Sequence, residues 1–134
     1  MKYILHGDPI ALQRPRFIRG YVVDFQSREK MLDGIQIKKQ YGLKEPLTGP
    51  IMADITFFMR MPKSYSDRKR DRLRDTSHYQ KPDIDNMIKY ILDVCNGILY
   101  KDDALISEIH ARKIWADLGK TEITLEKLNE SEDQ

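Results

Sequence analysis

The chain has 134 residues, and 23 lysines and arginines nearly balance 21 aspartates and glutamates to a net charge of +2. This length fits one domain, and any nucleic-acid signal must come from local clusters of charge. The single cysteine, Cys95, excludes an internal disulfide and a cysteine-rich zinc site. No apolar run approaches the roughly 18 residues of a membrane span, so we expect a cytoplasmic protein that makes no use of a membrane.

The first third of the chain alternates short extended segments with one helix. Residues 2–6 predict a strand that Gly7-Asp8-Pro9 ends, and residues 8–20 read as a loop. Residues 21–23 favour a second short strand. A helix is expected from Ser27 until Gly42, with apolar residues recurring at Met31, Leu32, Ile35 and Tyr41.

The centre of the chain contrasts a strong strand with a very polar stretch. Residues 51–61 are dominated by β-branched and aromatic residues, which favours a strand that Pro62 ends. Residues 63–81 show no apolar face, and we interpret them as a mobile surface loop with at most one helical turn.

A strong helix is predicted to begin near Asp83, because apolar residues then recur at the spacing of one buried helical face. Residues 104–115 and 121–128 predict two strands joined by a turn at 117–120. The last residues, 129–134, form an acidic tail that we expect to be disordered. We therefore assign residues 1–128 to one domain. The apolar face of the predicted helix consists of Ile84, Met87, Ile88, Ile91, Leu92, Cys95, Ile98 and Leu99.

The densest chemical signal lies at the start of this helix, where Asp83 and Asp85 precede Lys89. A single aspartate at a helix start is more often a capping residue than a catalytic one. Two carboxylates close together repel each other, however, and a bound cation relieves that repulsion. Lys89 then lies one turn from Asp85, either as a solvated lysine paired with an acid or as a group that stabilises a reacting phosphate.

A second acidic pair, Asp102 and Asp103, follows the helix. A helix of about 14 residues is roughly 21 Å long, so Asp103 cannot meet Asp83 along the helix itself. The two groups meet only if the chain turns back, for instance through a strand antiparallel to the helix. If Asp83, Asp85 and Asp103 do converge, with Asp102 as a further candidate ligand, the all-oxygen set suits Mg²⁺ or Mn²⁺ and phosphodiester hydrolysis.

Taken together, these residues resemble the core signature of the RusA family of Holliday junction resolvases. The resemblance rests on Asp83-Ile84-Asp85-Asn86 with Lys89, followed about 14 residues later by Asp102-Asp103, and on Gln13-Arg14-Pro15-Arg16-Phe17 near the N-terminus. It extends from the first strand to about Leu125.

The resemblance implies an α+β fold in which a small mixed sheet packs with two main helices, and a homodimer that nicks four-way DNA junctions symmetrically with Mg²⁺. Asp83, Asp85 and Asp103 would be the essential acids, and Lys89 the essential lysine. Two symmetric nicks need two sites, and a two-fold homodimer supplies them most simply.

Two basic clusters are candidate DNA contacts. The segment 63–74 holds six basic residues against two acidic ones, and beside a nuclease motif we expect it to contact phosphates. A second cluster lies near Pro15, and Lys81 stands where some family members carry arginines. The expected DNA-binding residues are Arg14, Arg16, Arg68, Lys69, Arg70, Arg72, Arg74 and Lys81.

Two other functions stay open from the sequence. One is a related metal-dependent nuclease that acts on flaps or replication forks. The other is a non-catalytic protein that only binds branched DNA, although a pure binder gains nothing from three carboxylates beside phosphates.

Overall fold

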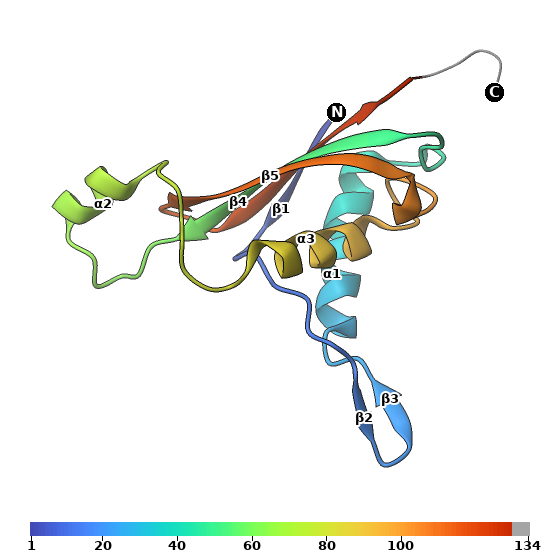
Figure 1. The fold of residues 1–134 in the computed structure, drawn as a ribbon, viewed down its shortest axis with the longest axis horizontal. Helices are drawn as coiled ribbons and strands as arrows, with labels where there is room; N and C mark the ends of the chain where they lie inside the picture. The colour runs from blue at the N-terminus through green and yellow to red at the C-terminus, as the bar shows by residue number, and fades with distance from the viewer. Residues whose placement is uncertain (130–134) are drawn as a thin grey trace.

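The computed structural model describes residues 1–129, and residues 130–134 of the predicted acidic tail lie outside the described part (Figure 1). The chain forms an α+β domain around a mixed four-stranded sheet, as predicted, with a separate two-stranded sheet. Its elements are β1 (Lys2–His6), β2 (Arg16–Ile18), β3 (Tyr21–Val23), α1 (Ser27–Tyr41), β4 (Ile51–Arg60), α2 (Asp67–Leu73), α3 (Ile84–Cys95), the 3₁₀ turn η1 (Asp103–Leu105), β5 (Ile106–Ala116) and β6 (Lys120–Lys127).

The central strand of the main sheet is β4, in the order β1-β6-β4-β5. It pairs antiparallel with β6 and parallel with β5, and inward-facing residues such as Ile51, Ile55 and Phe57 are almost fully buried. The β-branched and aromatic residues that predicted this strand are the ones that fill the core. β5 forms one edge of the sheet and β1 the other.

Helices α1 and α3 lie against each other on one side of the sheet (Figure 1). Gly34 of α1 is buried at their contact, where a Cβ would lie 3.4 Å from the side chain of Ile98. Helix α3 buries Met87, Tyr90, Ile91, Val94 and Cys95, so the predicted apolar face is confirmed. Burial raises the pKa of the Cys95 thiol to about 12, as expected of a structural cysteine. None of the described helices is long and apolar enough to cross a membrane.

The prediction of which apolar residues form the inner face of α1 is mostly wrong. Met31, Leu32 and Ile35 are exposed by 60%, 48% and 46%, whereas Gly34, Ile37 and Tyr41 are buried. The helix itself begins and ends as predicted, with Gly42 at its C-cap in the left-handed region. Small and amphipathic residues therefore form its inner face, and larger apolar ones face outward.

The polar stretch 63–81 is not the mobile loop that its composition suggested. It contains α2, whose N-cap Ser66 accepts a hydrogen bond from the backbone N–H of Lys69. The helix buries no residue, and arginines hold it in place instead. Arg74 donates to Asp117 and to Asp71, and Arg70 donates to the carbonyl of Pro62.

A β-hairpin occupies part of the segment expected to be a loop. Strand β2 pairs antiparallel with the predicted short strand β3, and the pair projects away from the rest of the molecule (Figure 1). Arg19 and Gly20 connect them, both with positive φ, which suits a tight hairpin turn. We call residues 14–25 the arm.

The two edge strands of the main sheet differ in how far their outer backbone groups are hydrogen-bonded. The backbone of β1 is covered by side chains of α1: Gln40 exchanges two hydrogen bonds with Ile4, and Gln36 does the same with His6. At the other edge, residues 75–78 cover β5 only at Lys113 to Trp115. From Ile106 to Arg112, the described residues give the outer edge of β5 no strand partner.

Candidate active site

The carboxylate of Asp83 occupies a capping position without acting as a cap. Asp83 is the N-cap residue of α3, yet its side chain makes no hydrogen bond to the helix backbone. It accepts a hydrogen bond from Lys81 at 2.8 Å, and this ammonium lowers the pKa of Asp83. The capping interpretation, which was the main alternative to a catalytic role, therefore does not describe this residue.

Asp85 and Lys89 are exposed on the same side of α3. One oxygen of Asp85 accepts the backbone N–H of Asn86 at 2.9 Å. Lys89 makes no hydrogen bond or ion pair with any described residue, and the nearby acid Asp93 pairs with Lys30. An unpaired lysine one turn from Asp85 remains available to a ligand.

Lys113 of β5 also lies at the start of α3. Its ammonium donates to the backbone carbonyls of Gln80 and Pro82 at 2.6 and 2.7 Å, which fixes the segment that leads into Asp83. Desolvation lowers the pKa of Lys113, against the opposing attraction of Asp83. No sequence pattern marks this lysine, because only the fold brings β5 beside the start of α3.

An open cleft of about 600 Å³ lies at the start of α3. Asp83, Asp85 and Lys113 line it, together with Lys81 and Tyr79. Tyr79 is 80% exposed, so its ring is free to contact a bound molecule. Tyr65, by contrast, packs beside Trp115 and beneath Lys69.

The second acidic pair lies at the opposite end of α3. Asp102 accepts the backbone N–H of Ala104 at 3.0 Å and so caps η1. The carboxylate of Asp103 lies beside Asp102 and within electrostatic range of Asp93. Desolvation, followed by the hydrogen bond and negative charge of Asp102, raises the pKa of Asp103.

The chain does turn back along α3, but it does not bring Asp103 to Asp83. β5 begins beside Asp103 and reaches the start of α3 at Lys113, seven residues after Ile106. In an extended strand this is roughly 23 Å. Among residues 1–129, no group of three or more acidic, histidine or cysteine side chains is close enough to hold a metal ion. One copy of the chain thus carries its candidate carboxylate ligands in two separate pairs, one at each end of α3.

The basic residues expected to bind DNA divide into two groups. Arg70 is tied to Asp117 and to backbone carbonyls, and Arg74 is tied to Asp117 and Asp71. Lys69 lies 3.8 Å from the ring centre of Tyr65. Lys81 is paired with Asp83. The remaining four are exposed side chains, on α2 and on the arm: Arg68, Arg72, Arg14 and Arg16.

Comparison with known proteins assigns the chain to a family. The family description that matches the chain is "Endodeoxyribonuclease RusA", over residues 7–126. The chain belongs to the RusA family. It is therefore an endodeoxyribonuclease of the class that resolves crossover junctions. The chain is also 28% identical to the uncharacterized protein YqaN of Bacillus subtilis (strain 168), over 96% of this chain and 97% of that protein.

For this RusA-family chain, Lys113 should be a positioning residue. We expect Lys113→Met to lower the rate of single-turnover junction cleavage by a factor on the order of 10 to 10². The reason is that the backbone segment leading into Asp83 is then no longer held by hydrogen bonds to Lys113. Amide hydrogen exchange at residues 79–83 should accelerate in the same variant. Lys39→Met, at an exposed position of α1, is the matched control. An unchanged rate together with unchanged exchange would return Lys113 to an ordinary strand lysine.

Proposed function

We propose that this chain is a Mg²⁺-dependent endonuclease that resolves four-way DNA junctions by paired, symmetric nicks during recombination and repair. The observation that carries the proposal is the carboxylate of Asp83, which stands at a helix N-cap without capping it. A carboxylate held in an open cleft beside Asp85, and kept ionised by Lys81, is available for an external cation.

Asp83, Asp85 and Asp103 are the proposed metal ligands, with Asp102 as a further candidate. Their donor atoms are all carboxylate oxygens, which suits Mg²⁺, with Mn²⁺ as a substitute. When bound, the ion polarises the phosphate and lowers the pKa of an attacking water. Lys81, which neutralises Asp83 in the absence of metal, is then free to turn to a DNA phosphate.

Lys89 is proposed to stabilise the reacting phosphate. It projects from α3 one turn after Asp85, and no described acidic side chain neutralises it. A cation in this place favours the charge that develops on the phosphate oxygens during hydrolysis.

A homodimer is proposed to unite the two pairs of acids. The open stretch of β5 offers backbone groups to a second copy, whereas glutamine side chains occupy the β1 edge. Lys113 and Trp115 direct their backbone groups outward, and by alternation so does Ile109. Ile109 therefore has outward N–H and C=O groups that suit a two-fold antiparallel pair with Ile109 of the second copy.

This pairing has a direct consequence for the active site. In an antiparallel pair centred on Ile109, residues that precede it in one copy lie beside residues that follow it in the other. The η1 turn with Asp103 of the second copy would approach the Lys113 end of β5, where Asp83 and Asp85 lie. Each of the two sites would then draw acids from both copies, which also provides the symmetry that paired nicks need.

DNA is proposed to bind across the cleft toward α2 and the arm. Arg68, Arg72, Arg14 and Arg16 are the first candidates for phosphate contacts, because the described structure leaves their side chains exposed. Lys69, Arg70 and Arg74 are assigned a smaller part, since their side chains already hold α2 in place.

Substrate preference distinguishes the proposal from its alternatives. The chain should be incubated with a mobile four-way junction, a flap and a linear duplex, with Mg²⁺ and with EDTA. We expect symmetric nicks in the junction, only with Mg²⁺, and little cutting of the duplex. Faster cutting of the flap would favour the flap or fork nuclease. Binding without any cutting would favour the non-catalytic protein.

The composite site is tested by mixing two inactive variants. Asp83→Asn and Asp103→Asn should each abolish cleavage while junction binding persists, because the amides no longer repel phosphate. After the two variants exchange subunits, a mixed dimer carries one site with both substitutions and one with neither. About a quarter of all sites should then be intact, and single nicks should reappear in a gel assay.

The matched control mixes wild-type chain with a variant that carries both Asp83→Asn and Asp103→Asn. In the mixed dimers that form, each of the two sites carries one substitution. Junction nicking there should come only from wild-type dimers. If the two single variants stay inactive after verified subunit exchange, the acids do not complete each other across copies. Full activity of either single variant would remove that residue from the site.

The role of Lys89 is separable from DNA binding. We expect Lys89→Ala to lower the single-turnover rate by a factor on the order of 10² to 10³, with little loss of junction affinity. Lys101→Met, at an exposed lysine just after α3, serves as the charge control. An unchanged rate in Lys89→Ala would show that Lys89 is only a solvated surface residue.

A further inference from the structure

The arm exposes large apolar side chains on both of its faces. Phe17 is 75% exposed, Tyr21 is 74% exposed and Val22 is 69% exposed. In the antiparallel register Phe17 lies opposite Val22 and Ile18 lies opposite Tyr21, so the two aromatic rings project from opposite faces. An isolated two-stranded sheet is marginally stable in water, and this one has no core of its own to bury these residues.

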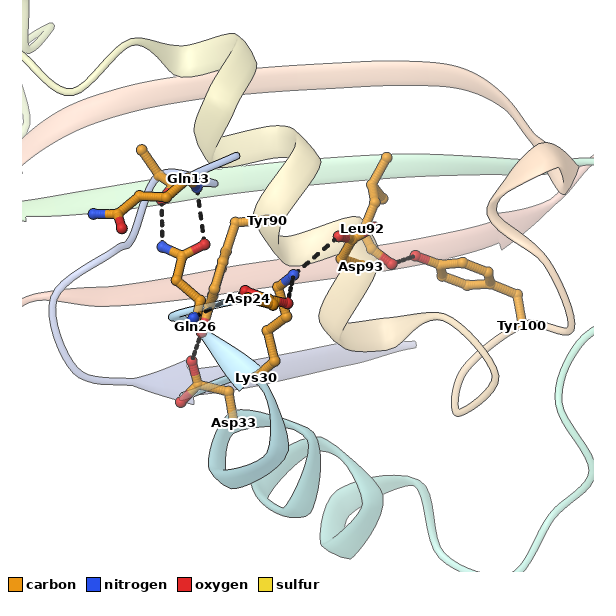
Figure 2. A network of polar contacts seen from close by, with 10 residues as sticks. Gln13, Asp24, Gln26, Lys30, Asp33, Tyr90, Leu92, Asp93 and Tyr100 are labelled. Carbon is orange, nitrogen blue, oxygen red and sulfur yellow. Dashed lines mark hydrogen bonds and ion pairs between the residues drawn. The ribbon is translucent and has the colours of Figure 1, made fainter. Parts of the chain in front are cut away.

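The base of the arm is nevertheless tightly held (Figure 2). The buried side chain of Gln26 accepts the backbone N–H of Gln13 and donates to the carbonyl of Ala11, each at 2.8 Å, so it ties together the two ends of the arm. Lys30 links Asp24 to Asp93 of α3 in the same network. The arm is therefore a positioned element rather than a loose loop.

This base is continuous with the candidate active site. Just before the arm, the backbone N–H of Leu12 donates to the carbonyl of Asn86 at 2.9 Å. Asn86 follows Asp85 directly in the first turn of α3. The segment that leads into the arm is thus fixed to the same turn of α3 that carries Asp85.

The charge of the arm indicates which kind of molecule binds it. Arg14, Arg16 and Arg19 are all exposed, and the single acidic residue, Asp24, is already neutralised by Lys30. Two such arms packed together would gather six guanidinium groups, which disfavours a pairing between arms of two copies. A polyanion with flat apolar faces matches both the arginines and the aromatic rings, and these are the properties of DNA with unpaired bases.

We propose that the arm binds unpaired DNA bases at the branch point, with bases stacked on Phe17 and Tyr21 and phosphates held by Arg14, Arg16 and Arg19. The inference rests on the proposed function, since it places the branch beside the cleft that cuts. Because the two rings face in opposite directions, the arm offers one stacking surface to each side of an opened branch. Linear duplex, whose bases are already stacked, gains little from them.

Leucine substitutions separate stacking from simple apolar burial. Phe17→Leu combined with Tyr21→Leu keeps apolar bulk but removes the rings. We expect this double variant to bind a four-way junction and a single-stranded oligothymidylate about tenfold or more weakly than wild type, as base stacking on an aromatic ring predicts. Affinity for a blunt duplex should change less than twofold. Binding is measured by fluorescence anisotropy in EDTA, so that no substrate is cut.

Val22→Ala is the matched control, since it changes an equally exposed residue of the same hairpin that has no ring, and it should bind junction as wild type does. Thermal unfolding by circular dichroism verifies that each variant is folded. Equal junction affinity of the double leucine variant and wild type would overturn the inference. Phe17→Ser combined with Tyr21→Ser tests whether the arm instead binds a second copy of the chain. A fall in the solution mass of this variant relative to wild type would assign the arm to a dimer contact and overturn the proposal.

Cleavage distinguishes this inference from the proposed function. If wild-type chain cuts junctions and the leucine variant binds them normally, the arm assignment fails and the nuclease stands. If wild-type chain binds oligothymidylate through the two rings but cuts no branched DNA, the proposed function fails and the arm assignment stands.

Discussion

The burial of one face of α3 is the constraint on which the rest of this structure depends. Met87, Ile91 and Cys95 fix the helix against the sheet, and β5 then runs back beside it. That packing holds Asp83 and Asp85 at one end of the helix and Asp103 at the other, so a rigid hydrophobic contact decides which acids one copy can bring together. The polar chemistry has to be arranged around this spacing, and the proposed pairing of two copies is one way to do so.

The parts of the fold that the sequence predicted are those where one physical signal dominates. The dense β-branched stretch at 51–61 became β4, and the regular apolar spacing after Asp83 became α3. In both elements burial and backbone preference favour the same structure. The acidic motif at the start of α3 was also visible in the sequence, because its residues are neighbours along the chain.

Other features depend on contacts between distant segments, which periodicity does not reveal. The outward position of Met31 follows from α1 packing through Gly34 instead. Helix α2 has no apolar face and is secured by Arg74 and its partner Asp117, 43 residues later. Lys113 lines the candidate active site only because β5 reaches the beginning of α3. The strand at Arg16–Ile18 was missed because it is three residues long and pairs only with β3, so no buried face imposes an alternating pattern on it.

The unequal edges of the main sheet bear on how the protein assembles without aggregating. A sheet with two open edges can add copies at either side and grow into a fibre. Here Gln36 and Gln40 satisfy the backbone groups of β1. Among the described residues of the main sheet, the outer edge of β5 from Ile106 to Arg112 has no strand partner. In the proposed two-fold pair, each copy would present its own glutamine-covered edge outward. In the proposed dimer, association through β5 would therefore stop at two copies, because Gln36 and Gln40 of α1 would block strand addition at both outer edges.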